Sequence, residues 1–318
     1  MSLVQQAIKT TSFNWAVGGW SFFIAENLFL SENRAFIIDA IGDDNYHYLY
    51  GLISTAACGS IGYAYLYKVR NAAPLSWSIG GTVPPAMRGA SFIFLAVGLG
   101  IISQVPPKLQ ISIIYASEGS ATAQKLLAEK ATEIQTTGPA AVPSPATPDG
   151  EPTLRVWKVR CPFDFTDSKS KISTDKMEYD QTNVQGLDRI SRHPGLWSMG
   201  LIGLGQACLS PSIPQRAWLS MPILVAVIGG WHTDSRHRRG IGGTLSERLD
   251  KQTSNIPFAA ILTGKQDDGD VLQSFAKLFQ ESKGLNVALG VGAAALIVLR
   301  KGRGGVSGAS GLKLHATR

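Results

Sequence analysis

Six apolar segments divide this chain, and they restrict it to a largely helical fold. A helix needs about 20 mostly apolar residues to cross the hydrocarbon core of a bilayer, and the six segments approach or reach that length. Most of them are closed by basic residues or by proline, as at membrane boundaries. We therefore predict an all-α, polytopic membrane bundle of about six helices. The segments are Ser12–Leu30, Tyr46–Tyr67, Ala86–Val105, Gly195–Leu209, Ala217–Trp231 and Leu285–Leu299.

The composition indicates that sizeable polar regions accompany these helices. Of 318 residues, 44% are hydrophobic and 17% charged, and the mean hydropathy of +0.06 is low for a pure membrane bundle. We predict three helices in 12–105, an inserted polar loop and linker in 106–185 that is partly disordered, three more helices in 186–300, and a flexible basic tail in 301–318. The linker contains four prolines within 136–151, which disfavour regular structure.

The net charge of +7 predicts contact with membrane lipid and not with nucleic acid, because basic residues flank the apolar segments. Membrane headgroups are also the expected partners of a basic group that follows the fifth segment. The three cysteines have no metal or disulfide spacing. The basic group consists of His232, Arg236, His237, Arg238 and Arg239, and the cysteines are Cys58, Cys161 and Cys208.

Two unusual strings carry the main indication of function. The first string, GLDRISRHPG at 186–195, places Arg189, Arg192 and His193 at the mouth of an apolar segment. Charge and imidazole are costly there unless they bind something. The second string, TSNIPFAAILTGKQ at 253–266, contains a proline within apolar residues. We expect it to re-enter the bundle and pack near His193.

Both strings resemble the NnrU membrane family, and within it the 15-cis-zeta-carotene isomerase branch. Three shorter motifs are similar as well, and their order and spacing agree from about residue 12 to residue 300 around an insertion at 108–176. These motifs are GDDNYHYL at 42–49, PLSW at 74–77, and Gly230-Trp231 followed by Asp234 and Arg236.

The resemblance implies an integral membrane protein that carries haem b and isomerises the central double bond of a carotenoid. It also implies a plastid membrane, either envelope or thylakoid, with the mitochondrial inner membrane as the alternative. The isomerase branch has a histidine ligand on the first helix, whereas this chain has Asn27 at that place, preceded by Glu26. Neither side chain is a usual haem ligand.

Helix order gives these positions a common side of the membrane. Asn27 ends the first segment, His47 begins the second and His193 begins the fourth, so all three would lie at one face. We therefore predict His193 and His47 as the iron ligands. The alternatives are that His193 caps its helix and meets lipid phosphate, and that His47 is an interfacial histidine between tyrosines.

The charged residues that are candidates for the site also have alternative interpretations. Arg189 and Arg192 are three apart and would share a face if their segment is helical, so they would bind haem propionates or phospholipid phosphate. Glu26 would pair with Arg34 or Arg192, or lie at the polar end of a cofactor pocket. The rival function is a non-catalytic, pigment- or lipid-binding subunit of a larger photosynthetic or respiratory membrane complex.

Overall fold

The computed structural model describes most of the helical chain, and it divides that chain into two compact units that are considered separately below. The described residues are 10–72, 83–105 and 184–303, with short strands at 114–117, 142–143 and 153–156. The first unit comprises Met1–Ala25, Ala57–Pro106 and Phe165–Arg318, and the second comprises Glu26–Ala56 and Pro107–Asp164. The motif at 74–77 and Cys161 lie outside the described residues.

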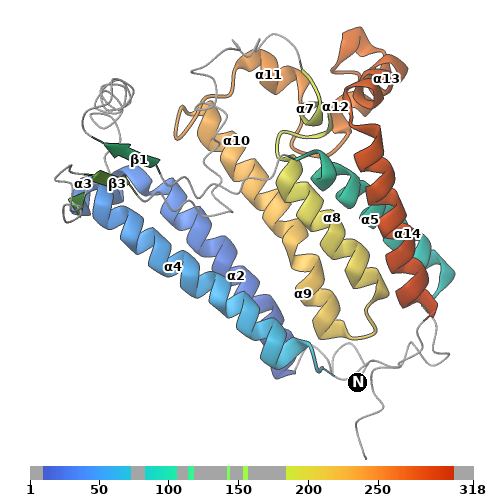
Figure 1. Cartoon of the computed structure of the whole chain (residues 1–318), viewed down its shortest axis with the longest axis horizontal. Helices are drawn as coiled ribbons and strands as arrows, with labels where there is room; N and C mark the ends of the chain where they lie inside the picture. Colours follow the sequence, from blue (N-terminus) through green and yellow to red (C-terminus); the bar gives the residue numbers. More distant parts are fainter. Residues whose placement is uncertain are drawn as a thin grey trace, which may run out of the picture. The chain divides into compact units, whose positions relative to one another are not determined.

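Each of the six apolar segments lies in a helix, so the predicted helical fold is confirmed (Figure 1). The second segment continues from α4 into a π-helical turn, and the fifth is a run of two α-helices joined by another π-helical turn. In chain order the elements are α2 (Thr11–Glu32), α4 (Asp43–Tyr63) with η1 (Ala64–Val69), α5 (Pro85–Gln104), α8 (Pro194–Leu209), α9 (Ile213–Leu224) with η4 (Val225–Gly229) and α10 (Gly230–Arg238), and α14 (Gly284–Arg303).

Two helices of the described chain, α5 and α14, are long and apolar enough to cross a membrane. The core helices of soluble proteins pass the same test, but they are mostly buried, whereas only 22% of the apolar window of α5 and 11% of that of α14 is buried. The continuous α8 and α9 are shorter, at 16 and 12 residues. Six complete spans therefore stay a prediction.

The helices of the first unit pack closely because glycines face their neighbours. Helix α5 packs against both α8 and α14, and α8 also packs against α9. A Cβ atom on Gly98 would lie 2.9 Å from Ile202 Cγ1, and one on Gly205 would lie 2.6 Å from Leu95 Cγ. Small residues at such contacts let helix backbones approach each other. A core of Leu95, Leu209, Ala294 and Val298 joins α5, α8 and α14.

Short elements cover one end of this bundle. Three of them, α7, α12 and α13, supply Ile190, Ile261 and Leu278 to a second apolar core, and Ile101 joins this core to α5. Because each of them has few turns, tertiary packing must hold them in place. These elements are α7 (Leu187–Ile190), α11 (Glu247–Gln252), α12 (Ala259–Leu262), η5 (Asp267–Gly269) and α13 (Val271–Glu281).

The second unit contains the adjoining parts of α2 and α4, the short helix α3 (Arg34–Ile41) and a small sheet. Strands β1 (Ile114–Ser117), β3 (Thr153–Val156) and β2 (Val142–Pro143) form this sheet in that order, with antiparallel pairing. The inserted segment, predicted as loop and linker, thus contributes strands to a fold that is otherwise helical.

Candidate functional site

The two strings meet in the first unit, at the end covered by the short helices. The backbone N–H of Arg192 donates to the carbonyl oxygen of Ser254 at 3.0 Å, and the N–H of Phe258 donates to that of Ile190 at 2.8 Å. The hydroxyl of Ser191 donates to the carbonyl oxygen of Asn255. The predicted packing of the second string near His193 is therefore confirmed.

Local sequence fixes where the histidine lies. Gly186 takes a positive φ of 56° before α7, and the chain becomes extended at Ser191. Pro194 then opens α8, because its missing N–H and fixed φ suit a first helical turn. His193 thus precedes the helix, but its side chain does not cap it. Since α7 ends at Ile190, Arg192 is not helical, and the shared helical face predicted for the two arginines does not form.

His193 and Arg192 both bind the carboxylate of Asp234, which lies on α10. The Nε2 atom of His193 is 2.7 Å from Asp234 Oδ1, and the NH2 of Arg192 is 2.6 Å from Oδ2. All three side chains are nearly buried, with 12%, 11% and 4% exposed for His193, Arg192 and Asp234. Burial raises the pKa of Asp234, but hydrogen bonds from His193 and Arg192 outweigh it and hold that pKa below its ordinary value.

The charge of Asp234 determines the chemistry open to His193. An ionised carboxylate only accepts hydrogen bonds, so Nε2 of His193 carries the hydrogen and donates it. In a neutral imidazole, Nδ1 then keeps the lone pair. A metal-binding histidine commonly donates its other N–H to a carboxylate in this way. The contact with Asp234 thus fixes the tautomer of His193 and leaves the lone pair on Nδ1.

The remaining donors of Arg192 are occupied as well. Its NH1 lies 3.1 Å from Asp250 Oδ1 and also donates to the carbonyl oxygen and hydroxyl of Thr253 at 3.1 Å. Asp250 in turn accepts two hydrogen bonds from Arg238, at 2.6 and 2.7 Å. These bonds connect the first string, α10 and α11 in one network.

Arg189 forms a second network beside the first. Its side chain is 7% exposed, and it binds Asp267 at 2.7 Å and Glu281 at 3.0 Å. The amide nitrogen of Gln266 donates to the carbonyl oxygen of Arg189 at 3.2 Å. Lys277 also contacts Asp267. Arg189 is therefore held in a fixed position, because carboxylates bind its side chain and the amide of Gln266 binds its backbone.

Each arginine of the first string is thus matched by two carboxylates of the protein. A haem propionate or a lipid phosphate at Arg189 or Arg192 would have to displace Asp267 and Glu281, or Asp234 and Asp250. Removing one partner from a buried pair is strongly unfavourable. The geometry favours a structural role for both arginines over the predicted binding of an external anion.

Glu26 and Asn27 lie in the second unit, and both are 6% exposed. The carboxylate of Glu26 accepts hydrogen bonds from Asn27 Nδ2 at 2.7 Å and from the hydroxyl of Ser54 at 3.2 Å. Tyr50 donates to Asn27 Oδ1 at 3.2 Å. The predicted partners of Glu26 are engaged elsewhere, since Arg34 stacks over the ring of Tyr46 and Arg192 binds Asp234.

His47 also lies in the second unit, near the start of α4, and its side chain is exposed. Its ring is edge-on to that of Tyr46, with centroids 5.7 Å apart. His193 belongs to the first unit. The pairing of His47 with His193 on one iron therefore stays a prediction, as does the role of Asn27 and Glu26 at a cofactor.

The basic group on α10 differs from its predicted role at lipid headgroups. Arg236 is only 2% exposed, and Arg238 is bound to Asp250. Gly242 has a positive φ of 74°, and a Cβ atom there would lie 3.0 Å from Arg236 NH2. At least two of these cations thus lie against the protein itself.

Sequence reasoning missed the acids that hold the site. Asp234 was noted only as part of a motif, although it lies three residues after Trp231 and continues the helix of the fifth segment. Asp250, Asp267 and Glu281 carry no recognisable spacing. The usable signal was that several arginines in apolar surroundings need an equal number of acids.

Gly230 is a further position that the structure explains. A Cβ atom there would overlap the side-chain amide of Asn255, whose Oδ1 accepts a hydrogen bond from Trp197 Nε1 at 3.0 Å. The same amide donates to the carbonyl oxygen of Val227. Because Gly230 has no side chain, the second string can pack against the surface of α10 at this point.

Within the described ranges, no three His, Cys, Asp or Glu residues are grouped so that they could hold a metal ion. Comparison of the chain with protein-family models, curated proteins and solved structures found no match.

Proposed function

We propose that this chain is a helical membrane protein that binds haem b through His193 and isomerises a carotenoid double bond. The observation that carries the proposal is the His193–Asp234 pair at the start of the apolar helix α8. Helices α5 and α14, which are long and apolar enough to cross a membrane, support a membrane location. The ordered strings and their resemblance to the zeta-carotene isomerase branch support the reaction.

Within the site, the imidazole of His193 is the group suited to binding haem iron. Asp234 fixes the orientation of His193 by accepting a hydrogen bond from its Nε2–H, which increases the basicity of Nδ1. Arg192 keeps the carboxylate of Asp234 in place from the other side. Haem iron, when bound, would supply a Lewis acid or a one-electron couple to the polyene. Apolar helix surfaces would exclude water from the substrate.

One observation favours the rival function, a non-catalytic membrane subunit. The acids that neutralise Arg189 and Arg192 leave neither side chain available to a cofactor or substrate. Both networks then serve to hold the second string and α13 on the bundle. On this account His193 is one more hydrogen-bond donor to Asp234.

The test is conversion of 15-cis-zeta-carotene by membranes that contain the protein, followed by chromatography of the isomers. Wild-type membranes and membranes with His315→Ala, a substitution outside the described residues, should convert the substrate. Membranes with His193→Ala should not. Haem-loaded wild-type protein that fails to convert the substrate, and that purifies as part of a large complex, would support the rival function instead.

A further inference from the structure

Helix α13 carries apolar side chains on two of its sides. One side packs on the protein, where Leu278 belongs to the second apolar core and Val271 and Phe275 lie against that core. The other side is exposed. Leu272 and Phe279 are seven residues apart, so they point the same way from the helix, and they are 82% and 70% exposed. We name this side the apolar flank of α13, and it consists of Leu272, Ala276 and Phe279.

Packing on the rest of the helix determines which way the apolar flank points. Residues two apart lie on nearly opposite sides of an α-helix. Ser274, two residues after Leu272, is buried. Glu281, two residues after Phe279, binds Arg189 at 3.0 Å. The apolar flank therefore faces away from the protein, while the opposite side of α13 is held by buried and charged contacts.

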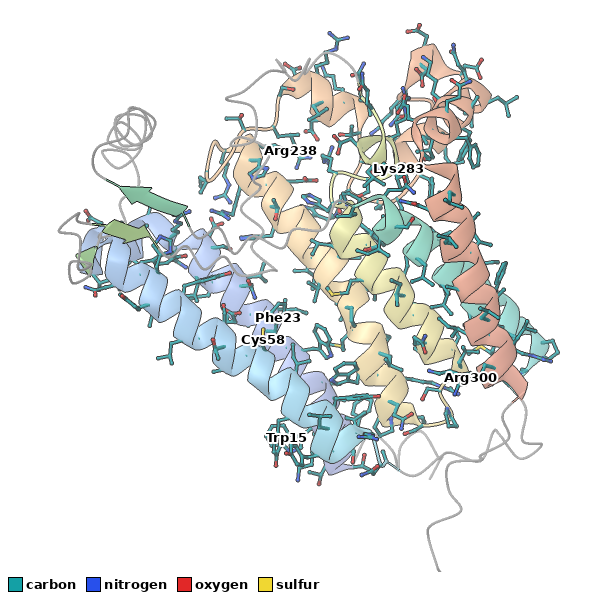
Figure 2. The ribbon with its side chains drawn as sticks, viewed as in Figure 1. Trp15, Phe23, Cys58, Arg238, Lys283 and Arg300 are labelled. Atoms are coloured by element: carbon teal, nitrogen blue, oxygen red, sulfur yellow. The ribbon has the colours of Figure 1, made fainter. Side chains whose placement is uncertain are left out.

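The junction of α13 with α14 is fixed to the end of α5. Only Ser282 and Lys283 separate the two helices. Gln104, the last residue of α5, holds the backbone of Lys283, because its Oε1 accepts a hydrogen bond from the N–H at 2.8 Å and its Nε2 donates to the carbonyl oxygen at 3.2 Å. Figure 1 shows α13 beyond the start of α14, and Figure 2 labels Lys283 at their junction.

Polar side chains mark this junction as a boundary. Asn286 Nδ2 donates to the carbonyl oxygen of Ser103 at 3.0 Å, next to the contacts of Gln104 with Lys283. Beyond these groups both helices become apolar, since neither 287–299 of α14 nor 92–102 of α5 contains a polar side chain. Such a change is expected where helices enter the hydrocarbon core of a bilayer.

The outward face of α14 is apolar from its first turn. Leu285, Leu289 and Leu296 are 74%, 65% and 70% exposed. They are spaced by four and by seven residues and so lie on one face of the helix. Leu285 comes only six residues after Phe279. The two-residue link thus connects the apolar flank of α13 to a helix face that is suited to lipid.

A bilayer around α14 would also supply the cover that the apolar flank lacks. Single exposed apolar residues are ordinary, but a row of them on an amphipathic helix marks a surface that contacts something. A helix of this pattern lies in the membrane interface, with its apolar side among the acyl chains and its polar side toward headgroups and water. Gln273 and Gln280, which are exposed beside the flank, provide such polar groups.

We propose that α13 is an interfacial helix, whose apolar flank inserts between the lipids around the start of α14. Through its contacts with Arg189 and Asp267, it attaches the short helices at this end of the bundle to the membrane surface. The inference rests on the membrane location in the proposed function, and it is independent of haem.

The experiment measures which medium surrounds each side of α13. A single spin label is placed on the full chain in phosphatidylcholine vesicles, after the three cysteines have been replaced by serine. Collisions of the label with oxygen, which dissolves in lipid, are compared with collisions with a nickel chelate, which stays in water. The label positions are Leu272→Cys and Phe279→Cys on the apolar flank, and Gln273→Cys and Gln280→Cys beside it.

The ratio of oxygen to nickel collisions should be higher at Leu272→Cys and Phe279→Cys than at the two glutamine positions. Equal ratios on both sides of the helix, or a higher ratio at the glutamine positions, would overturn the proposal. Labels on the flank that neither reagent reaches, and that broaden each other's spectra between molecules, would also overturn it, because a second copy of the chain would then cover the flank.

A reference label at Leu296→Cys, on the outward face of α14, separates this inference from the proposed membrane location. A high ratio at Leu296→Cys with low ratios at Leu272→Cys and Phe279→Cys would refute the interfacial helix alone. A low ratio at all three positions would refute the membrane location as well.

Polar substitution of the apolar flank tests whether its insertion stabilises the protein. Leu272→Gln combined with Phe279→Gln should lower the midpoint of thermal unfolding in vesicles by a few degrees, because both side chains lose their burial in lipid. The matched control is Gln273→Ala combined with Gln280→Ala, which should leave the midpoint unchanged. A flank variant that unfolds at the wild-type temperature or above it would contradict the proposal.

Discussion

Asp234 connects the histidine and an arginine of the first string to α10. It binds His193 and Arg192 at the same time, and it is 3% exposed. We expect Asp234→Asn to destabilise the protein by about 3–5 kcal/mol, because the substitution removes the closer of the two carboxylates that pair with the nearly buried guanidinium of Arg192. Thermal or denaturant unfolding in detergent measures this change.

The control for that substitution is Glu247→Gln. Glu247 makes an ion pair with Lys251, but both side chains are largely exposed, at 84% and 72%. Exposed pairs contribute about 0–1 kcal/mol. If the two variants lose equal stability, the central position of Asp234 in the network is wrong.

Asp267 and Asp250 predict how stability depends on pH. Burial raises the pKa of Asp267, but Lys277, Ser274 and Arg189 outweigh it, so the folded pKa is lowered. A hydrogen bond from Arg238, opposed by burial and aided by Arg192, lowers the pKa of Asp250. Both carboxylates therefore stabilise the fold above their unfolded pKa of about 4.

This stabilisation should disappear as pH falls from about 4 through the lowered folded values, since protonation removes the charge that the basic partners bind. The midpoint of thermal unfolding should fall over that range. In Asp267→Asn the fall should be smaller. An unfolding midpoint that does not change between pH 6 and pH 3 would contradict the lowered pKa values.

At the scale of single elements, close approach of helices should be sensitive to added volume. A Cβ atom on Gly203 of α8 would overlap the carbonyl oxygen of Leu219 on α9. We expect Gly203→Ala to cost about 1–3 kcal/mol, because backbone atoms cannot move aside as a flexible side chain can. The measurement is the unfolding midpoint of the purified variant.

Gly195→Ala on the same helix is its control, since a Cβ atom there has no other atom within 4 Å. It should be neutral or slightly stabilising, because alanine favours helix more than glycine does. Comparable losses in both variants would mean that the α8–α9 contact is looser than described.

Helix positions were predictable to within a few residues, because apolar runs of this length have few other solutions. Helix boundaries were less predictable. The fifth segment was expected to end at Trp231, but the helix continues to Arg238. The basic side chains in its last turn stabilise this extension, because they interact favourably with the negative end of the helix dipole. Hydropathy alone does not register this effect.

The connection between α9 and α10 was also beyond sequence reasoning. Pro222 lies inside α9, and the chain adjusts with the π-helical turn η4 directly after it. A proline removes one backbone donor and crowds the preceding turn, but neighbouring helices can support such a site. The sequence showed the proline without showing how the helix would continue.

For the whole molecule, the sequence predicted which strings come together but not what neutralises them. The meeting of residues 186–195 with 253–266 was expected, and backbone hydrogen bonds confirm it. The partner acids come from α10, α11, η5 and α13, which are far apart in the chain. Only the folded arrangement shows that the arginines are already matched.

The most direct test of the central claim is the absorption spectrum of the purified protein, oxidised and then reduced with dithionite. Wild-type protein and His315→Ala, both made with ample haem, should show a Soret band that shifts on reduction, and His193→Ala should lack it. Absence of the band from wild-type protein, or its persistence in His193→Ala, would contradict haem binding at His193.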